Sequence, residues 1–296
     1  MNPVLKGYLR LARPANLPTA AADILAGTAI AGIFTELPLE SFLTIHLLFL
    51  IGSTICLYAG GVVLNDVFDA ELDKIERPER PIPSGLIKLN SARTFGGILL
   101  MVGIILAFLV NNLCGSVALI LAFAILSYDI FAKKNGVLGP LNMGICRGLN
   151  LLLGMAIVGV INQWWLAIIP IFYIAAITLI SRGEVHGDNK KHIILAGAFY
   201  ASVIVALLFL IIFNNLNTLQ ALPFLILFAF LIFRPLINAY QSNSPENIKK
   251  AVIAGVLSLI VLDATIVVGF SEWWLGILTI LLFPLSIYLS KLFAVT

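Results

Sequence analysis

Residues 42–66 read FLTIHLLFLIGSTICLYAGGVVLND, and this stretch decides the fold class. From Phe42 to Asn65 it contains no Asp, Glu, Lys or Arg. A helix needs about 20 predominantly apolar residues to cross the hydrocarbon core of a bilayer. The stretch therefore predicts a membrane-spanning helix that ends in an amide and a carboxylate.

The rest of the chain has the same character. Of its 296 residues, 60% are hydrophobic and 11% are charged, and the mean hydropathy is +1.05. Soluble domains carry about 25% charged residues, so the composition excludes an ordinary soluble protein and leaves little chain for an aqueous domain. We expect residues 1–296 to form one transmembrane domain among membrane lipids. The net charge of +3 gives no reason to expect a nucleic-acid partner.

Apolar runs separated by charged or turn-rich breaks predict the other helices. Ten candidate spans result: 17–34, 42–66, 92–110, 113–131, 138–160, 163–181, 192–213, 218–240, 248–269 and 272–293. Only Ser271 and Glu272 separate the last two, and several spans are short. Nine spans with one re-entrant or interfacial segment is therefore an alternative. The predicted fold class is all-α, a polytopic transmembrane helical bundle of nine or ten spans.

The basic residues of the connections fall on one side of this bundle. They are Lys6, Arg10, Arg13, Lys74, Arg77, Arg80, Lys88, Arg93, Lys133, Lys134, Arg182, Lys190, Lys191, Lys249, Lys250 and Lys291. The opposite connections contain no Lys or Arg. By the positive-inside rule, both chain termini and the long connections 65–93 and 181–192 are expected on the cytoplasmic side, in a bacterial inner membrane.

The first long connection opens with an acidic motif, Asn65-Asp66-Val67-Phe68-Asp69-Ala70-Glu71-Leu72-Asp73. On a helix, Asp66, Asp69 and Asp73 project from one face, where like charges repel. Mg²⁺ prefers a few carboxylate oxygens together with water and phosphate oxygens, so the motif favours a magnesium site. The alternative is a solvated acidic helix end balanced by Lys74, Arg77 and Arg80.

Three prolines follow the acidic motif and stop the helix, at Pro78, Pro81 and Pro83. The stiff turn is expected to hold Arg77 and Arg80 near the acidic face. Fixed cations beside a metal suit a diphosphate group.

The string NDVFDAELDKIERPERPIPSG resembles the first aspartate-rich signature of the UbiA superfamily of intramembrane prenyltransferases. The resemblance extends to Arg13-Pro14 and to the stretch from Tyr128 to Arg147. It implies a helical bundle with a lateral lipid-facing opening that uses Mg²⁺ to bind and ionise an isoprenoid diphosphate. It also implies that Asn65 assists the first metal site.

The second family signature, an aspartate-rich DxxDxxGD, is expected after the sixth span. Here the chain reads Ser181-Arg182-Gly183-Glu184-Val185-His186-Gly187-Asp188, with Ser181 at the first acidic position. Glu184 and Asp188 are four residues apart and could share a helix face to hold a second Mg²⁺. Alternatively, Arg182 and His186 neutralise them and leave a structural cap. The sequence SRGEVHGD, together with NDVFDAELD, is similar to the sequences of a UbiA-like subgroup called EboC.

Isolated polar residues in or beside the spans have two interpretations each. Arg147 lies in an apolar run, where it points to phosphate in a cavity or pairs with a carboxylate. Lys134 snorkels to headgroups or, as the resemblance implies, contacts diphosphate. Asp263 is a structural hydrogen-bonding group or part of an acceptor site.

These patterns predict an enzyme that transfers a prenyl group from an allylic diphosphate to a small aromatic or lipid acceptor. Its predicted metal-binding and catalytic residues are Asp66, Asp69, Asp73, Glu184 and Asp188, and its diphosphate-binding residues are Asn65, Arg77, Lys134 and Arg147. The alternative is a non-catalytic or transport-type UbiA-like protein that binds a lipid diphosphate or an amphiphilic metabolite. An intramembrane aspartyl protease is disfavoured, because Val185 stands where a GxGD motif needs glycine.

Overall fold

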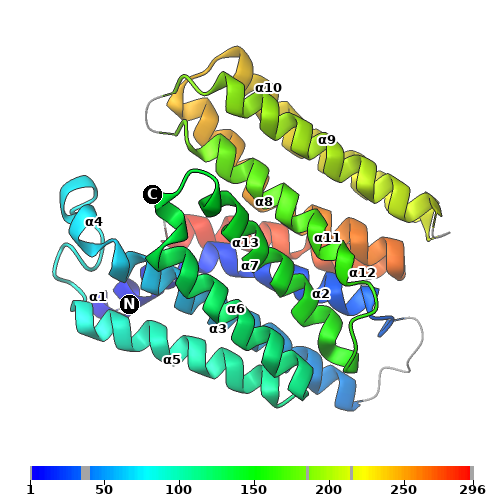
Figure 1. Ribbon diagram of the computed structural model, residues 1–296, viewed down its shortest axis with the longest axis horizontal. Helices are drawn as coiled ribbons and strands as arrows, with labels where there is room; N and C mark the ends of the chain where they lie inside the picture. Colours follow the sequence, from blue (N-terminus) through cyan, green and yellow to red (C-terminus); the bar gives the residue numbers. More distant parts are fainter. Residues whose placement is uncertain (1, 35–40, 185–186, 214–215, 294–296) are drawn as a thin grey trace.

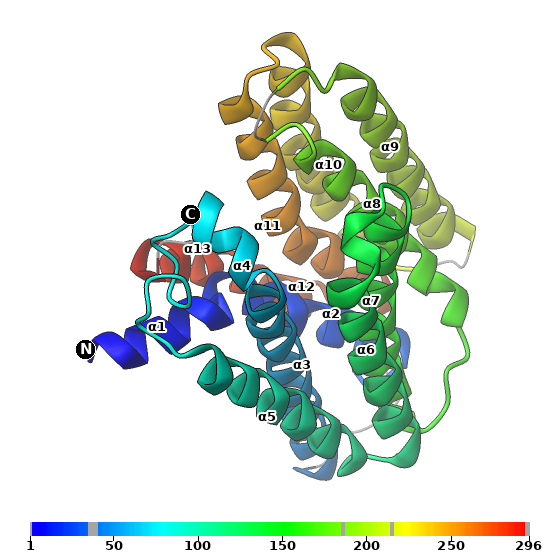
Figure 2. The same cartoon turned by 60° about the vertical axis from the view of Figure 1, so that its left-hand side comes forward.

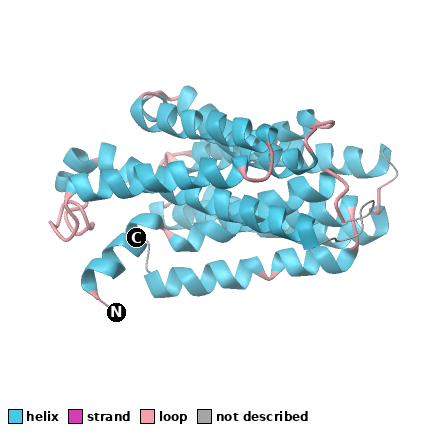
Figure 3. Cartoon of the chain, turned by 90° about the horizontal axis from the view of Figure 1, so that it is seen from below, coloured by secondary structure: helices cyan, strands magenta, loops and turns pink. Residues whose placement is uncertain are grey.

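The computed structural model describes residues 2–34, 41–184, 187–213 and 216–293. Every regular element in these ranges is a helix (Figure 3), which confirms the all-α prediction. The α-helices are α1 (Pro3–Ala12), α2 (Leu17–Ile30), α3 (Ser41–Phe68), α4 (Ala70–Glu76), α5 (Leu89–Phe108), α6 (Asn112–Ile130), α7 (Leu138–Met155), α8 (Ile168–Ser181), α9 (Lys190–Phe213), α10 (Thr218–Gln241), α11 (Pro245–Phe270), α12 (Trp273–Ile280) and α13 (Leu282–Phe293). Short 3₁₀ turns are η1 (Pro14–Asn16), η2 (Ala132–Lys134), η3 (Ala156–Val158) and η4 (Trp164–Ala167).

Within these described ranges, 9 helical segments are long and apolar enough to cross a membrane. They match nine of the ten expected spans, so the prediction of nine or ten is confirmed. The exception is α2, whose 14 residues reach only about 21 Å at 1.5 Å per residue, against a hydrocarbon core of about 30 Å. The chain is an integral membrane protein.

The short helix α2 and its neighbour α7 lie at the centre of the bundle. One apolar core joins them to α8–α11, and a second joins them to α3, α5 and α6. Figure 1 shows these two groups on either side of the central pair. Gly27 and Gly154 let the central helices touch, because a Cβ on Gly27 would lie 2.3 Å from the Leu151 carbonyl oxygen. Small residues at such crossings are typical of helix packing in membranes.

Helices α1 and α4 lie at one end of the bundle (Figures 1 and 2), where α1 contacts α3 and α13. The side chain of Asn2 accepts a hydrogen bond from the Val4 amide and starts α1. The helix ends at Arg13, whose φ of 46° places it in the left-handed region. Ser286 of α13 donates a hydrogen bond to the Ala15 carbonyl in η1. These contacts fix the position of Arg13 at the end of α3.

Candidate active site

The acidic motif lies where α3 passes into α4. Asp69 separates the two helices with φ −90° and ψ 2°. Its amide still donates to the Asn65 carbonyl at 3.0 Å, and the Asp73 amide donates to the Asp69 carbonyl at 2.8 Å. The backbone therefore keeps nearly helical spacing through a kink, and the three aspartates stay at the same end of the bundle.

Asp66 and Asp73 form one half of the site, around Arg80. Arg80 Nη1 lies 3.2 Å from Asp66 Oδ1 and 2.7 Å from Asp73 Oδ2. Arg13 Nη2 lies 2.6 Å from the same Asp66 oxygen. Asp66 is 6% exposed and Asp73 is 3% exposed, so both carboxylates depend on these cations, because an unpaired buried charge is costly. The prolines that follow α4 place Arg80 on the acidic motif.

Asp69 belongs to the other half of the site, with α6 and η2. Its Oδ1 lies 2.5 Å from Nζ of Lys133. The spacing in the sequence predicts one face for all three aspartates, but the kink turns Asp69 towards Lys133 and away from Arg80. Asn65 also faces α6, where its Nδ2 donates to Asp129 Oδ1 at 2.8 Å. The other oxygen of Asp129, Oδ2, is buried and has no hydrogen-bond partner among the described residues.

The site therefore combines oxygen donors of a magnesium type with internal cations. Within the residues that the structure describes, no group of three or more His, Cys, Asp or Glu is arranged to hold a metal ion. Each aspartate of the motif is instead paired with a cation. The donors nevertheless suit a hard cation, because they are carboxylate and amide oxygens and because Asp129 keeps an unsatisfied oxygen.

The second motif lies in the connection between α8 and α9, and Val185 and His186 fall outside the described residues. The sequence predicts that Glu184 and Asp188 share a helix face, and this prediction is wrong. The segment leaves the helix after Ser181, and Gly187 and Asp188 have φ of 70° and 50°. Glu184 is half-buried and Asp188 is exposed.

Glu184 connects this motif to the first one. Burial raises the pKa of Glu184, while the nearby positive charges of Lys249 and Arg77 oppose the rise. The charge of Arg77 therefore acts on Glu184, whereas Arg80 pairs with the aspartates. The turn that contains Pro78 and Pro81 therefore supplies Arg80 to the first motif, while the charge of Arg77 acts on the second.

Asn189 anchors the second motif and is absent from the predicted site. Its Nδ2 donates to the Ile180 carbonyl at 2.9 Å and caps the end of α8, and its amide donates to Asn243 Oδ1 at 2.7 Å. Asn189 is buried, whereas its neighbour Asp188 faces solvent. A glycine before a polar pair, as in Gly187-Asp188-Asn189, is the signal that indicates a turn of this kind.

Two of the predicted diphosphate ligands lie elsewhere than expected. Lys134 is exposed and forms no ion pair with any described residue, whereas its neighbour Lys133 holds Asp69. Arg147 is buried inside the bundle, with its Nε 2.7 Å from Asp23 Oδ2. Its side chain also donates to the Thr19 carbonyl. The carboxylate-paired interpretation of Arg147 thus matches the structure, and the phosphate-facing one does not.

Arg147 is part of a polar cluster that joins four helices. Asn150 Nδ2 donates to Asp23 Oδ2 at 2.8 Å, and Thr54 Oγ1 donates to Asn150 Oδ1 at 2.6 Å. Asp263 of α11 is buried as well and interacts electrostatically with Asp23. The contact between Gly27 and Gly154 brings α2 and α7 close enough for this cluster to form.

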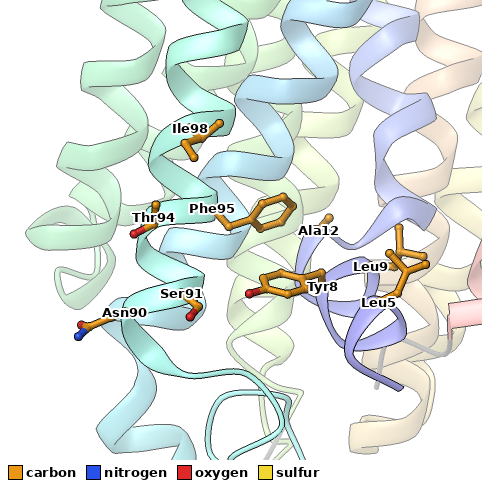
Figure 4. Close-up of a pocket in the computed structure, with 9 residues that line it drawn as sticks. All are labelled: Leu5, Tyr8, Leu9, Ala12, Asn90, Ser91, Thr94, Phe95 and Ile98. Atoms are coloured by element: carbon orange, nitrogen blue, oxygen red, sulfur yellow. The ribbon is translucent and has the colours of Figure 1, made fainter. Parts of the chain in front are cut away.

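A groove of about 650 Å³ lies between α1 and α5. Tyr8 and Phe95 face each other across it (Figure 4), with ring centroids 5.0 Å apart in an edge-to-face arrangement. Most of its other lining side chains, such as Leu5, Leu9 and Ile98, are apolar. The groove borders the helix that presents Arg13 to Asp66.

The model of the UbiA prenyltransferase family matches residues 25–256. The chain belongs to this family. The matched residues include both acidic motifs and Lys133. They leave out Arg13 and Asp23, which precede residue 25, and Asp263, which follows residue 256.

Curated relatives of this UbiA family member are named digeranylgeranylglyceryl phosphate synthase. The relative from Sulfurisphaera tokodaii is 33% identical over 176 residues, which are 59% of this chain and 61% of the relative. The one from Methanococcoides burtonii is 40% identical over 157 residues, 52% of this chain and 56% of the relative. The matched part thus spans less than two thirds of either relative. The EboC subgroup stays a prediction.

Solved structures share the fold. A digeranylgeranylglyceryl phosphate synthase structure has a TM-score of 0.66 at 23% identity and covers 90% of this chain and 98% of its own. A UbiA homologue from Archaeoglobus fulgidus bound to DMAPP and Mg²⁺ has a TM-score of 0.65 at 15% identity, covering 88% and 99%. At these identities the likeness establishes the UbiA fold.

Proposed function

We propose that this protein is a membrane prenyltransferase that transfers an isoprenoid group from an allylic diphosphate to a lipid acceptor in a Mg²⁺-dependent reaction. The observation that carries the proposal is the charge-matched cluster at the end of α3. Asp66, Asp69 and Asp73 are neutralised by Arg13, Arg80 and Lys133. Such a cluster can exchange its internal ion pairs for a metal and a polyanion without a large change in total charge.

In this proposal, Asp66, Asp69, Asp73 and Asn65 hold one Mg²⁺, and Glu184 and Asp188 hold a second. Bound Mg²⁺ would supply positive charge that stabilises the departing diphosphate. Arg13, Arg80 and Lys133, once turned away from the carboxylates, would donate hydrogen bonds to phosphate oxygens. These three residues join Arg77 and Lys134 as proposed diphosphate ligands. Arg147 is not among them, because it is paired with Asp23.

The reaction also requires that water is excluded from the site, and the apolar interior of the bundle is suited to this. Loss of diphosphate leaves an allylic cation, which must be kept from water until the acceptor attacks. The site lies at the end of a bundle whose helices are apolar along their length. The curated relatives are named for a glyceryl phosphate product, which supports a glyceryl phosphate lipid as the acceptor over a small aromatic compound.

We also propose that 1–296 is one domain with the active-site end facing the cytoplasm, in a bacterial inner membrane as the sequence predicts. Cysteine labelling in membranes tests the orientation, after the native Cys56, Cys114 and Cys146 have been replaced by serine. Cysteines at exposed Glu79 and Gln241 should react from the cytoplasmic side, and cysteines at exposed Trp164 and Glu272 from the opposite side. Reversed reactivity would overturn the orientation.

The function itself is tested with purified protein, Mg²⁺ and allylic diphosphates of several chain lengths, each offered with a panel of lipid and aromatic acceptors. The expected result is pyrophosphate release together with a prenylated lipid, in equal amounts. Tight binding of the diphosphates without pyrophosphate release from any pair would favour the alternative, a protein that binds or transports a lipid diphosphate.

A further inference from the structure

A second groove lies between α10 and α11, outside the site described above. It has a volume of about 390 Å³. Its polar side chains are Arg234 and Asn238 from α10 and Asn247 and Lys250 from α11, and Phe230 and Ala254 form its apolar part. Figure 1 shows α10 and α11 together, within the helix group that packs on one side of α2 and α7.

Arg234 is the unusual residue in this groove. It lies within a membrane-spanning helix, is exposed, and forms no ion pair with any residue that the structure describes. Its guanidinium lies 5.5 Å from the centroid of the Phe230 ring. An unpaired arginine in a spanning helix is costly unless it reaches headgroups or a partner. Arg234 precedes the end of α10 by seven residues, about 10 Å along the axis, so its long side chain can extend towards the headgroups at that end of the helix.

The residues around Arg234 complete a site for an anion. Asn238 follows it by one helical turn and makes no side-chain hydrogen bond within the described ranges. On α11, Lys250 lies 2.7 Å from Glu246, but both side chains are more than half exposed, so this pair holds Lys250 weakly. Two cations and two amides therefore line the polar end of a groove whose other end is apolar.

We propose that this groove binds an anionic phospholipid. Arg234 and Lys250 contact the lipid phosphate, Asn238 donates hydrogen bonds to headgroup oxygens, and an acyl chain lies along Phe230 and Ala254. Asn247 lines the groove but already donates to the Ser242 carbonyl at 3.0 Å. Basic pockets between membrane-spanning helices recognise anionic headgroups in this way. The site does not depend on the proposed prenyl transfer, because none of these residues belongs to the two acidic motifs.

Native mass spectrometry of the full-length protein in detergent tests the proposal. The protein is offered equal amounts of dioleoyl phosphatidylglycerol and dioleoyl phosphatidylcholine, which differ only in the headgroup. Wild type should retain phosphatidylglycerol preferentially, and Arg234→Gln and Lys250→Gln should each weaken its retention by roughly fivefold. Glu246→Gln should strengthen it, because the competing carboxylate is removed. Thermal melting in lipid-free detergent establishes that the variants are folded.

A matched control uses Arg93→Gln, which removes an exposed arginine on α5 at a distance from the groove. It should leave phosphatidylglycerol retention unchanged. Equal retention of the two lipids by wild type would overturn the proposal and indicate that Arg234 extends to solvent without binding a lipid. An equal loss of phosphatidylglycerol retention with Arg93→Gln would mean that retention depends on the net charge of the protein and not on this groove. If inorganic phosphate at the same concentration displaces phosphatidylglycerol, the groove recognises free phosphate, and the proposed lipid ligand is wrong.

Discussion

Arg80 joins two aspartates on different helices, with its Nη1 3.2 Å from Oδ1 of Asp66 on α3 and 2.7 Å from Oδ2 of Asp73 on α4. The turn that carries it is closed by backbone hydrogen bonds, from the Ser84 amide to the Arg80 carbonyl and from the Ile87 amide to the Pro81 carbonyl. The arginine is therefore held at the acidic motif by the fold itself. A metal and a diphosphate at this site would have to share or displace it.

Arg80→Gln should destabilise the metal-free protein, because it leaves Asp73 buried without a cation. Breaking a buried ion pair costs about 3 kcal/mol or more. Added Mg²⁺ should recover part of the lost stability, since it replaces the missing charge. Thermal unfolding in detergent with and without Mg²⁺ measures both effects. The control Arg77→Gln removes an exposed arginine and should melt near wild type, whereas equal melting of Arg80→Gln and wild type would contradict the assigned pairing.

The neighbouring lysines Lys133 and Lys134 should differ in their effect on turnover. Lys133 lies 2.5 Å from Asp69, whereas Lys134 is exposed and forms no ion pair with the described residues. Lys133→Gln should lower the rate of pyrophosphate release on the order of a hundredfold, as loss of one preorganised charge at a developing anion does. Lys134→Gln should lower it by much less. A larger loss for Lys134→Gln would return the diphosphate role to the residue that the sequence motif indicates.

Asp23 and Arg147 should act as a structural pair. Asp23→Asn leaves the buried arginine without its carboxylate and should lower stability by about 3–5 kcal/mol. The double variant Asp23→Leu with Arg147→Met removes both charges and should recover much of that loss. The KM for allylic diphosphate should stay near the wild-type value in the double variant. A large rise in KM with retained stability would place Arg147 at the substrate after all.

Glu184 should make stability depend on pH in metal-free buffer. Burial raises its pKa above the usual 4.5, so the folded protein holds the proton more tightly than the unfolded chain. The free energy of unfolding therefore falls as pH rises from the usual value through the raised one, and Glu184→Gln should lack this fall. Urea unfolding at several pH values measures it, with Glu79→Gln as the exposed control. Parallel curves for wild type and Glu184→Gln would rule out this coupling.

The sequence predicts the helices well, and the physical reason is local. The run from Thr44 to Phe68 is free of Asp, Glu, Lys and Arg up to Asp66, and hydrophobic length alone identifies such a span. The α2 segment is the exception, because its apolar run continues past the end of the helix at Ile30. The helix ends there because the chain turns at Gly32, whose φ is 79°, and a glycine after the last turn ends a helix without changing the hydropathy.

The site is predicted only in part, because its pairings join distant parts of the chain. The motif from Asn65 to Asp73 identifies the acidic half, but Arg13 and Lys133 are 53 and 64 residues from their partners. Spacing along one helix cannot reveal such contacts. Arg147 is another example, because its partner Asp23 lies on α2, more than a hundred residues earlier in the chain.

In the proposed reaction, the aspartates at the end of α3 exchange their internal cations for Mg²⁺ and diphosphate. The direct measurement is the dissociation constant of an unreactive allylic thiolodiphosphate, with and without Mg²⁺, for wild type, Asp66→Asn and Asp69→Asn. Tight binding by wild type only with Mg²⁺, and loss of the Mg²⁺ effect in both folded variants, is the predicted result. Equal affinity in the presence and absence of Mg²⁺ for wild type, or an unchanged Mg²⁺ effect in Asp66→Asn, would contradict the account.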